Sequence, residues 1–206
     1  MKTWRGYRLV LGCAVGLGLA GAAGALPVTN QLVSLTGSWR YTTNNVDASA
    51  WTAVGYNDSS WKGPSNALFY IESATLPAGK NTRLPARPDG HPTPCYYFRT
   101  SFSLTALNDL VALHVTHLTD DGAIFYLNGV EIQRVRMSAG SVGYETEALD
   151  TPPDGDATAF ESFAVVGASL TNLVVGVNVL AVRVHQHGTD SSDVVFGAKV
   201  STVSDP

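Results

Sequence analysis

Two short segments of the sequence carry the side chains best suited to ligand chemistry. The first is His185-Gln186-His187, followed by Asp190 and Asp193. Residues two apart on a strand project from the same face, so His185 and His187 are expected to face one ligand. With Asp190 they would make a set of the kind that binds transition metals. No third histidine or cysteine follows at ligand spacing. The sequence therefore favours a hydrogen-bonded loop from Asp190 to Asp193 and predicts no metal.

The second segment is Asp120-Asp121-Gly122. Its two carboxylates would be presented to a cation or to the hydroxyl groups of a ligand. The alternative is a turn in which the aspartates accept hydrogen bonds from nearby backbone N–H groups and the glycine takes a positive φ. The turn is favoured, because it requires these residue types whatever the domain does.

A stretch over residues 138–158 is rich in acidic side chains, among them Asp150, Asp154 and Asp156. Carboxylate oxygens are the ligands that Ca²⁺ prefers, but the alternating spacing of an EF-hand loop is absent. A solvated acidic loop is therefore favoured, and a structural Ca²⁺ is the alternative; no cofactor is required. Tyr144, in the same stretch, is the aromatic residue freest to contact a ligand.

Sequence motifs of catalytic centres are absent. The chain has no Gly-x-Ser-x-Gly, no His-Glu-x-x-His and no phosphate-binding glycine-rich loop. Five glutamates, Glu72, Glu131, Glu145, Glu147 and Glu161, could in principle supply the carboxyl pair of a glycosidase, but sequence spacing cannot show two carboxyl groups flanking one bond. His114 and His117 lie three apart on a predicted strand, so they face opposite sides and cannot chelate. We predict that the protein is not an enzyme. A metal-dependent hydrolase is the least favoured hypothesis.

Composition sets the class of the protein. The chain has 206 residues, of which 45% are hydrophobic and 15% charged, and its formal net charge is −4. This composition suits a packed globular core. The negative balance speaks against nucleic acid as a partner, because a sequence-independent binder needs a basic surface.

The N-terminus has the three-part layout of a secretory signal peptide. Three basic residues precede an apolar run over 9–22, and small residues at 23–25 offer a cleavage site. We expect cleavage after Ala25, with Ala22 as the alternative, and a single domain over 26–206. The mature chain has no other apolar run of membrane-spanning length. The prediction is a secreted protein, periplasmic or extracellular, in which Cys95 is the only cysteine and a buried bystander.

The elements that must position these residues are predicted to be strands. Apolar side chains alternate with polar or small ones in three segments, through Phe98, Phe102 and Leu104, through Val111, Leu113 and Val115, and through Leu180, Val182 and Val184. Further β-type runs cover 37–41, 67–71, 159–165 and 194–202. Asn128-Gly129 lies between two strand-like runs and predicts a hairpin with a type I′ turn. Two long loops, over 76–95 and 138–158, interrupt the pattern.

Taken together, four motifs resemble galactose-binding-like jelly-roll domains, especially the sugar-binding-type module of family 2 glycoside hydrolases and of exported bacterial surface proteins. The resemblance runs from about residue 39 to 200, and a weaker one to the PA14 domain covers 120–129. The motifs are Trp51…Tyr56-Asn57-Asp58-Ser59-Ser60-Trp61, Tyr96 to Phe102, Asp120-Asp121-Gly122…Leu127-Asn128-Gly129, and Gly176 to Gln186 with Ser191-Ser192-Asp193.

The resemblance implies an all-β, antiparallel jelly-roll sandwich of about eight or nine strands with two long loops. It also implies that Trp51 and Trp61 plug the open end of the sandwich as core residues. The leading functional hypothesis is an exported, non-catalytic module that binds carbohydrate through loops at one end. The expected ligand-binding residues are Asp120, Asp121, Tyr144, His185, His187, Asp190 and Asp193.

A rival hypothesis is a structural or interaction domain. It would be an accessory or truncated front end of a larger cell-surface protein or glycoside hydrolase, and the end of the sequence at Pro206 motivates it.

Overall fold

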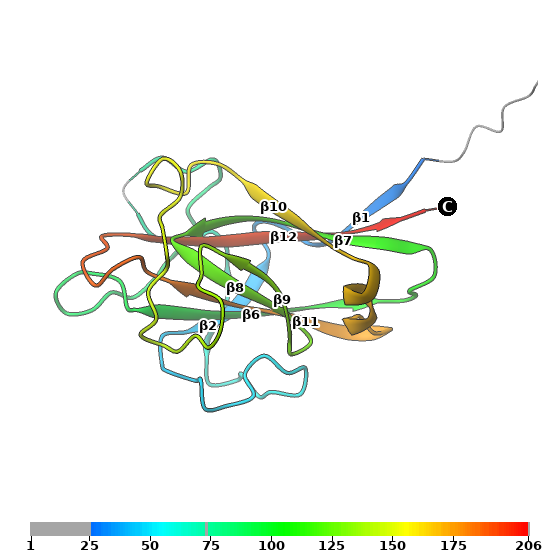
Figure 1. Ribbon diagram of the computed structural model, residues 1–206, viewed down its shortest axis with the longest axis horizontal. Helices are drawn as coiled ribbons and strands as arrows, with labels where there is room; N and C mark the ends of the chain where they lie inside the picture. Colours follow the sequence, from blue (N-terminus) through cyan, green and yellow to red (C-terminus); the bar gives the residue numbers. More distant parts are fainter. Residues whose placement is uncertain (1–25, 73, 206) are drawn as a thin grey trace, which may run out of the picture.

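The computed structural model describes residues 26–72 and 74–205, which form two β-sheets packed face to face (Figure 1). Sheet A has the strand order β10-β7-β12-β4-β5, with β1 also paired to β12. Its strands are β1 (Val28–Val33), β4 (Phe69–Ile71), β5 (Thr82–Arg83), β7 (Leu110–Asp120), β10 (Glu161–Val166) and β12 (Val194–Ser204). All of its pairs are antiparallel except β4 with β5.

Sheet B has the order β3-β2-β6-β11-β8-β9, and every pair in it is antiparallel. Its strands are β2 (Ser38–Thr42), β3 (Lys62–Asn66), β6 (Cys95–Leu104), β8 (Gly122–Leu127), β9 (Val130–Val135) and β11 (Gly176–His185). A 3₁₀ helix, η1 (Gly167–Asn172), connects β10 to β11.

The predicted all-β antiparallel sandwich is confirmed, but the described residues contain twelve strands where eight or nine were expected. Short edge strands account for part of the difference. β5 has two residues and lies inside the predicted loop 76–95, and β3 contains Gly63 and Pro64. Glycine and proline weaken a strand pattern and are tolerated mainly at sheet edges, so the sequence gives little sign of such strands.

The two sheets meet in one apolar core, as the alternating pattern predicted. The three predicted apolar positions of β6 and the three of β11 all belong to this core. Phe196 of β12 packs against them from sheet A, with its ring centroid 4.4 Å from that of Phe98 and 5.2 Å from that of Trp39. The inward-facing residues are Phe98, Phe102 and Leu104 on β6 and Leu180, Val182 and Val184 on β11.

One position in the predicted alternation is wrong. Val111 was expected to face inward with Leu113 and Val115, but its side chain is 44% exposed. The pairing of β7 with β12 is irregular at this point, because Leu110 and Ala112 pair with consecutive residues of β12 and Val111 has no partner. A residue without a cross-strand partner interrupts the alternation of faces along the strand. Val111 is that residue in β7, and its side chain points to solvent.

The Asn128-Gly129 hairpin is confirmed between β8 and β9. Asn128 has φ 51° and Gly129 has φ 94°, the positive values that a two-residue turn of this type requires. The side chain of Asn128 also holds the turn against β11. Its Oδ1 accepts the Val179 N–H at 2.8 Å, and its Nδ2 donates to Asn178 Oδ1 at 2.8 Å.

Gly129→Val is expected to lower the free energy of unfolding by about 1–3 kcal/mol, because a β-branched residue is strained at positive φ. Space is not the cause, since a Cβ here would meet no atom closer than 3.8 Å. Thermal unfolding measures the effect. Gly55→Val is the control, because a Cβ there would meet open space and its φ lies outside the left-handed region. Equal melting temperatures for the two variants would contradict the strain.

The segment 43–61 forms a third layer over the outer face of sheet B, where it lies below β2 and β6 in Figure 1. Trp51 and Trp61 pack there with Tyr97, and the Trp51 and Tyr97 ring centroids are 5.0 Å apart. Both tryptophans are buried, as predicted, but they do not plug the end of the sandwich. Tyr97 of β6 and Val179 and Ala181 of β11 project from this outer face, and the segment 43–61 shields them from solvent.

No helix among the described residues is long and apolar enough to cross a membrane. The predicted signal peptide, residues 1–25, lies outside the described residues.

Candidate functional site

Three segments gather at one end of the sandwich, on the left of Figure 1 and opposite η1. They are residues 74–94 after β4, residues 136–160 after β9, and residues 186–193 between β11 and β12. Two of these segments contain the long loops that the sequence predicted. The ends of β4 and β7 and the start of β12 reach the same place, so the strands fix the positions of the side chains there.

Strand pairing brings three carboxylates onto the outer face of sheet A. Val194, the first residue of β12, pairs with Ile71, the last residue of β4, so Asp193 and Glu72 lie opposite each other just beyond the ends of these strands. On the other side of β12, Asp120 pairs with Val195, which is two residues from Asp193 and projects from the same face. Asp120 and Asp193 are therefore diagonal neighbours.

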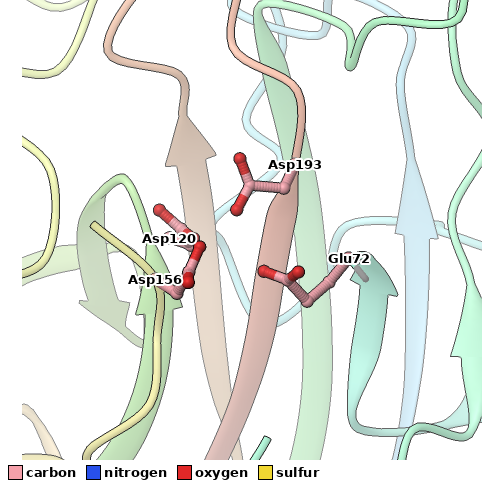
Figure 2. Close-up of side chains that lie close together, drawn as sticks. All are labelled: Glu72, Asp120, Asp156 and Asp193. Carbon is pink, nitrogen blue, oxygen red and sulfur yellow. The ribbon is translucent and has the colours of Figure 1, made fainter. Parts of the chain in front are cut away.

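A fourth carboxylate, Asp156 in the loop 136–160, completes what we call the acid cluster: Glu72, Asp120, Asp156 and Asp193 (Figure 2). Each residue places one carboxylate oxygen within 4.8 Å of the others. Asp120 is 1% exposed, and the other three are partly buried. Four acidic groups thus share one small space at the protein surface.

The acid cluster has one basic side chain beside it, Lys80, whose Nζ donates to the Glu72 backbone carbonyl oxygen at 2.7 Å and whose charge opposes the rise in the pKa of Glu72. Among the described residues, no lysine, arginine or histidine nitrogen lies within 4.0 Å of any of its carboxylate oxygens. Asp120 Oδ2 and Glu72 Oε2 are buried without a hydrogen-bond partner. Burial, and then the carboxylates of Asp121 and Asp193, raise the pKa of Asp120 to about 10. Burial also raises the pKa of Glu72.

Asp121 has a different environment from its neighbour Asp120. Its Oδ2 accepts the His187 N–H at 2.7 Å, and its own N–H donates to the His185 carbonyl oxygen at 3.3 Å. The side chain is 3% exposed. Asp121 does accept a backbone N–H, but from a residue 66 positions away, and Gly122 lacks the positive φ that the turn interpretation expected. Asp121 therefore holds the start of the loop 186–193 instead of forming a local turn.

Two hollows adjoin the acid cluster. The first, which we call the end hollow, has a volume of about 370 Å³ and is lined by Asp121, His187, Asp190, Ser191, Ser192 and Asp193, among others. The second, the Tyr70 hollow, has a volume of about 390 Å³, and its lining includes Tyr70, Glu72, Arg83, Asp156, Ser192 and Asp193. The two hollows share Ser192 and Asp193. Five of the seven predicted ligand-binding residues therefore lie around this end, with Asp120 beneath the surface.

The other two predicted residues lie on the outer side of sheet B. His185 is fully buried; its Nδ1 lies 2.7 Å from the Thr146 carbonyl oxygen, and its Nε2 accepts the Arg183 Nε–H at 2.7 Å. Burial and the Arg183 charge lower the pKa of His185 to about 4. His185 was expected to share a face with His187, but β11 ends at His185 and His187 is exposed in the loop. The alternation stops where the strand stops.

Tyr144 is packed against the segment 43–61. Its ring stacks on Tyr97 with centroids 6.3 Å apart, and its hydroxyl donates to the Thr43 carbonyl oxygen at 3.0 Å. Cys95, the first residue of β6, belongs to the same cluster and is fully buried, as predicted. Burial raises the pKa of its thiol to about 12. These groups join the covering layer to the sheet.

Sequence reasoning singled out Asp120 and Asp193, and it placed Asp156 in an acidic loop, but it did not connect Glu72 with them. Glu72 lies 48 or more residues before the other three in the chain. Only the antiparallel pairing of β4 with β12 brings it to the site. A signal was present in the run Phe69-Tyr70-Ile71-Glu72, where a carboxylate follows a short apolar strand.

Another hollow, of about 480 Å³, lies elsewhere, on the outer face of sheet B. Its charged groups already bind one another. Arg99 Nε donates to Asp58 Oδ2 at 2.9 Å, and Arg40 Nη1 donates to the Gly63 carbonyl oxygen at 3.1 Å. The Arg99 guanidinium also lies over the Tyr56 ring, 5.3 Å from its centroid. Because these partners are satisfied within the protein, the hollow offers fewer free polar groups than the loop end.

No protein-family profile matches the chain. No curated protein sequence matches it significantly either.

Among solved structures, β-glucuronidase 2 from Bacteroides uniformis is similar over 86% of this chain and 18% of its own, with 16% sequence identity and a TM-score of 0.47. A glycosyl hydrolase family 2 member from Bacteroides cellulosilyticus is similar over 86% and 21%, with 12% identity and a TM-score of 0.48. A β-glucuronidase from an uncultured Clostridium is similar over 90% and 30%, with 12% identity and a TM-score of 0.45. The chain spans only these fractions of the enzymes. Family 2 glycoside hydrolases are the group that the sequence motifs resemble.

Proposed function

We propose that the protein is a non-catalytic accessory domain that binds carbohydrate at the loop end of the sandwich. The observation that carries this proposal is the pair of adjoining hollows, which are lined mostly by polar side chains. Each volume lies within the range of about 300–1,000 Å³ that is usual for small-ligand pockets. The proposal includes secretion, which rests on the predicted signal peptide.

The lining groups suit a ligand that is covered with hydroxyl groups. Asp190 and Ser192 are exposed in the end hollow. The Asp190 carboxylate can accept hydrogen bonds from ligand hydroxyls, and the Ser192 hydroxyl can both donate and accept them. Arg83 is exposed in the Tyr70 hollow and donates only. The half-buried Tyr70 ring in that hollow offers an apolar face to the C–H groups of a sugar ring. Lys80 Nζ lies 5.5 Å from the centroid of the same ring.

Affinity is expected to be modest, because open hollows bury little of a ligand and binding must order the loops around them. The first experiment is a binding screen of the chain against plant, algal and host glycans, followed by calorimetric titration of any ligand found. If no glycan of the panel binds, carbohydrate binding loses its support and the rival hypothesis, a structural or interaction domain, is favoured.

Asp190→Ala is expected to weaken binding of that glycan at least about tenfold. A hydrogen bond to a charged group contributes about 1.5–3 kcal/mol, and 1.4 kcal/mol corresponds to a factor of ten in affinity. Val177→Ser, in the hollow on the outer face of sheet B, is the matched control and should leave the affinity unchanged. If Val177→Ser weakens binding and Asp190→Ala does not, the ligand binds on the sheet face and the location proposed here is wrong.

A further inference from the structure

The acid cluster has properties that a carbohydrate site does not explain. It brings four carboxylates together, and among the described residues no basic side chain pairs with any of them. Asp120 is 99% hidden from solvent, and its Oδ2 has no hydrogen-bond partner. Burying a charged carboxylate without a partner is costly, so such a group either stays protonated or pairs with a cation or a metal ion. No basic side chain of the described residues forms an ion pair with these four carboxylates, so a bound cation would supply the missing positive charge.

We propose that the acid cluster binds one Ca²⁺ ion. Ca²⁺ takes oxygen ligands at about 2.3–2.6 Å, so two oxygens on opposite sides of the ion are at most about 5 Å apart. One carboxylate oxygen from each of the four residues lies within 4.8 Å of the corresponding oxygens of the other three, which suits that span. Mg²⁺ needs shorter contacts and near-ideal octahedral geometry, so it fits less well. A set of oxygens without imidazole or thiolate also disfavours Zn²⁺ and Cu²⁺.

The origin of the four ligands indicates what the ion does. Asp120 is the last residue of β7, Glu72 follows the end of β4 and Asp193 precedes the start of β12, three neighbouring strands of sheet A. Asp156 belongs to the loop 136–160. An ion held by all four would tie this loop to the ends of β4, β7 and β12. It would also fix Asp193 and Ser192, which line both hollows. The site would therefore join the loop 136–160 to the ends of three hydrogen-bonded strands of sheet A.

The test is titration of the chelator-treated chain with CaCl₂ alone, followed by calorimetry and thermal unfolding. We expect one ion to bind per chain. At about 100-fold excess over the dissociation constant, the melting temperature should rise by roughly 5–10 °C. MgCl₂ at the same concentration should give a smaller rise. Because no glycan is present, the result does not depend on whether carbohydrate binds.

Asp120→Asn and Asp193→Asn keep the shape of the side chain and remove its charge, and both should abolish the calcium-dependent rise. Two variants are needed because either could alter folding, and the melting temperature in chelator reports that separately. Asp154→Asn is the matched control, since Asp154 is an exposed acid of the same loop outside the acid cluster, and it should keep the full rise. Absence of calcium binding by the unaltered chain would overturn the proposal. A full rise in both Asp120→Asn and Asp193→Asn would do so as well.

Discussion

Replacing Asp47 with alanine is expected to lower the free energy of unfolding by about 3–5 kcal/mol, because it leaves a buried arginine without its counter-charge. Arg183 projects from β11 toward the covering segment 43–61, and its side chain is only 5% exposed. Its Nη2 lies 3.1 Å from Asp47 Oδ1, and its guanidinium lies 5.4 Å from the centroid of the Tyr97 ring. Among the described residues, Asp47 is the only acid within 4.0 Å of it.

Asp47 has a second role that the substitution also removes. Its Oδ1 accepts a hydrogen bond from the Tyr97 hydroxyl at 2.7 Å, so Asp47→Ala leaves the hydroxyl of this buried side chain without that partner. Denaturant unfolding of Asp47→Ala, Arg183→Met and the double variant forms a complete cycle. The double variant should lose much less stability than the sum of the two single variants, because the pair is removed together. Additive losses would show that Asp47 and Arg183 do not stabilise each other.

Phe196→Ala is expected to cost a similar amount, about 3–5 kcal/mol, for a different reason. Phe196 is fully buried between the sheets and contacts the rings of Phe98 and Trp39. Truncation removes apolar contacts from both sheets and leaves a cavity that the surrounding strands cannot easily close.

Phe160→Ala is the matched control for Phe196→Ala. Phe160 is 46% exposed and lies outside the core, so the same chemical change should alter the free energy of unfolding by no more than about 0.5 kcal/mol. Denaturant midpoints of the two variants check the contrast. Equal losses would mean that the two sheets do not meet at Phe196.

Local sequence patterns predicted the strands well. The alternation in β6 and β11 placed six apolar residues in the core, and Asn128-Gly129 identified the turn between β8 and β9. These features depend on residues that are close in the sequence, where the two-residue period and the demand for positive φ act directly. Val111 shows the limit of this reasoning. Its exposure depends on an irregular pairing with β12, which the sequence of β7 alone does not contain.

The candidate site was harder to predict, because it depends on which strands become neighbours. Asp120 and Asp193 were named from their local motifs, but Glu72 joins them only through the order β7-β12-β4. In the same way, the burial of His185 depends on Arg183 and on a loop 39 residues away, of which Thr146 is part. Single-sequence patterns specify which face a side chain takes, whereas partners from distant segments decide what that face meets.

The pairing of β1 with β12 has a further consequence. Val28 and Ser204 are directly opposite each other, at the end of the sandwich away from the acid cluster (Figure 1). A short peptide could bridge these two positions, so the fold is suited to circular permutation and to insertion into a surface loop of a host protein. In an insertion, both covalent connections would leave from one pole, and the opposite pole would remain free to face the surroundings.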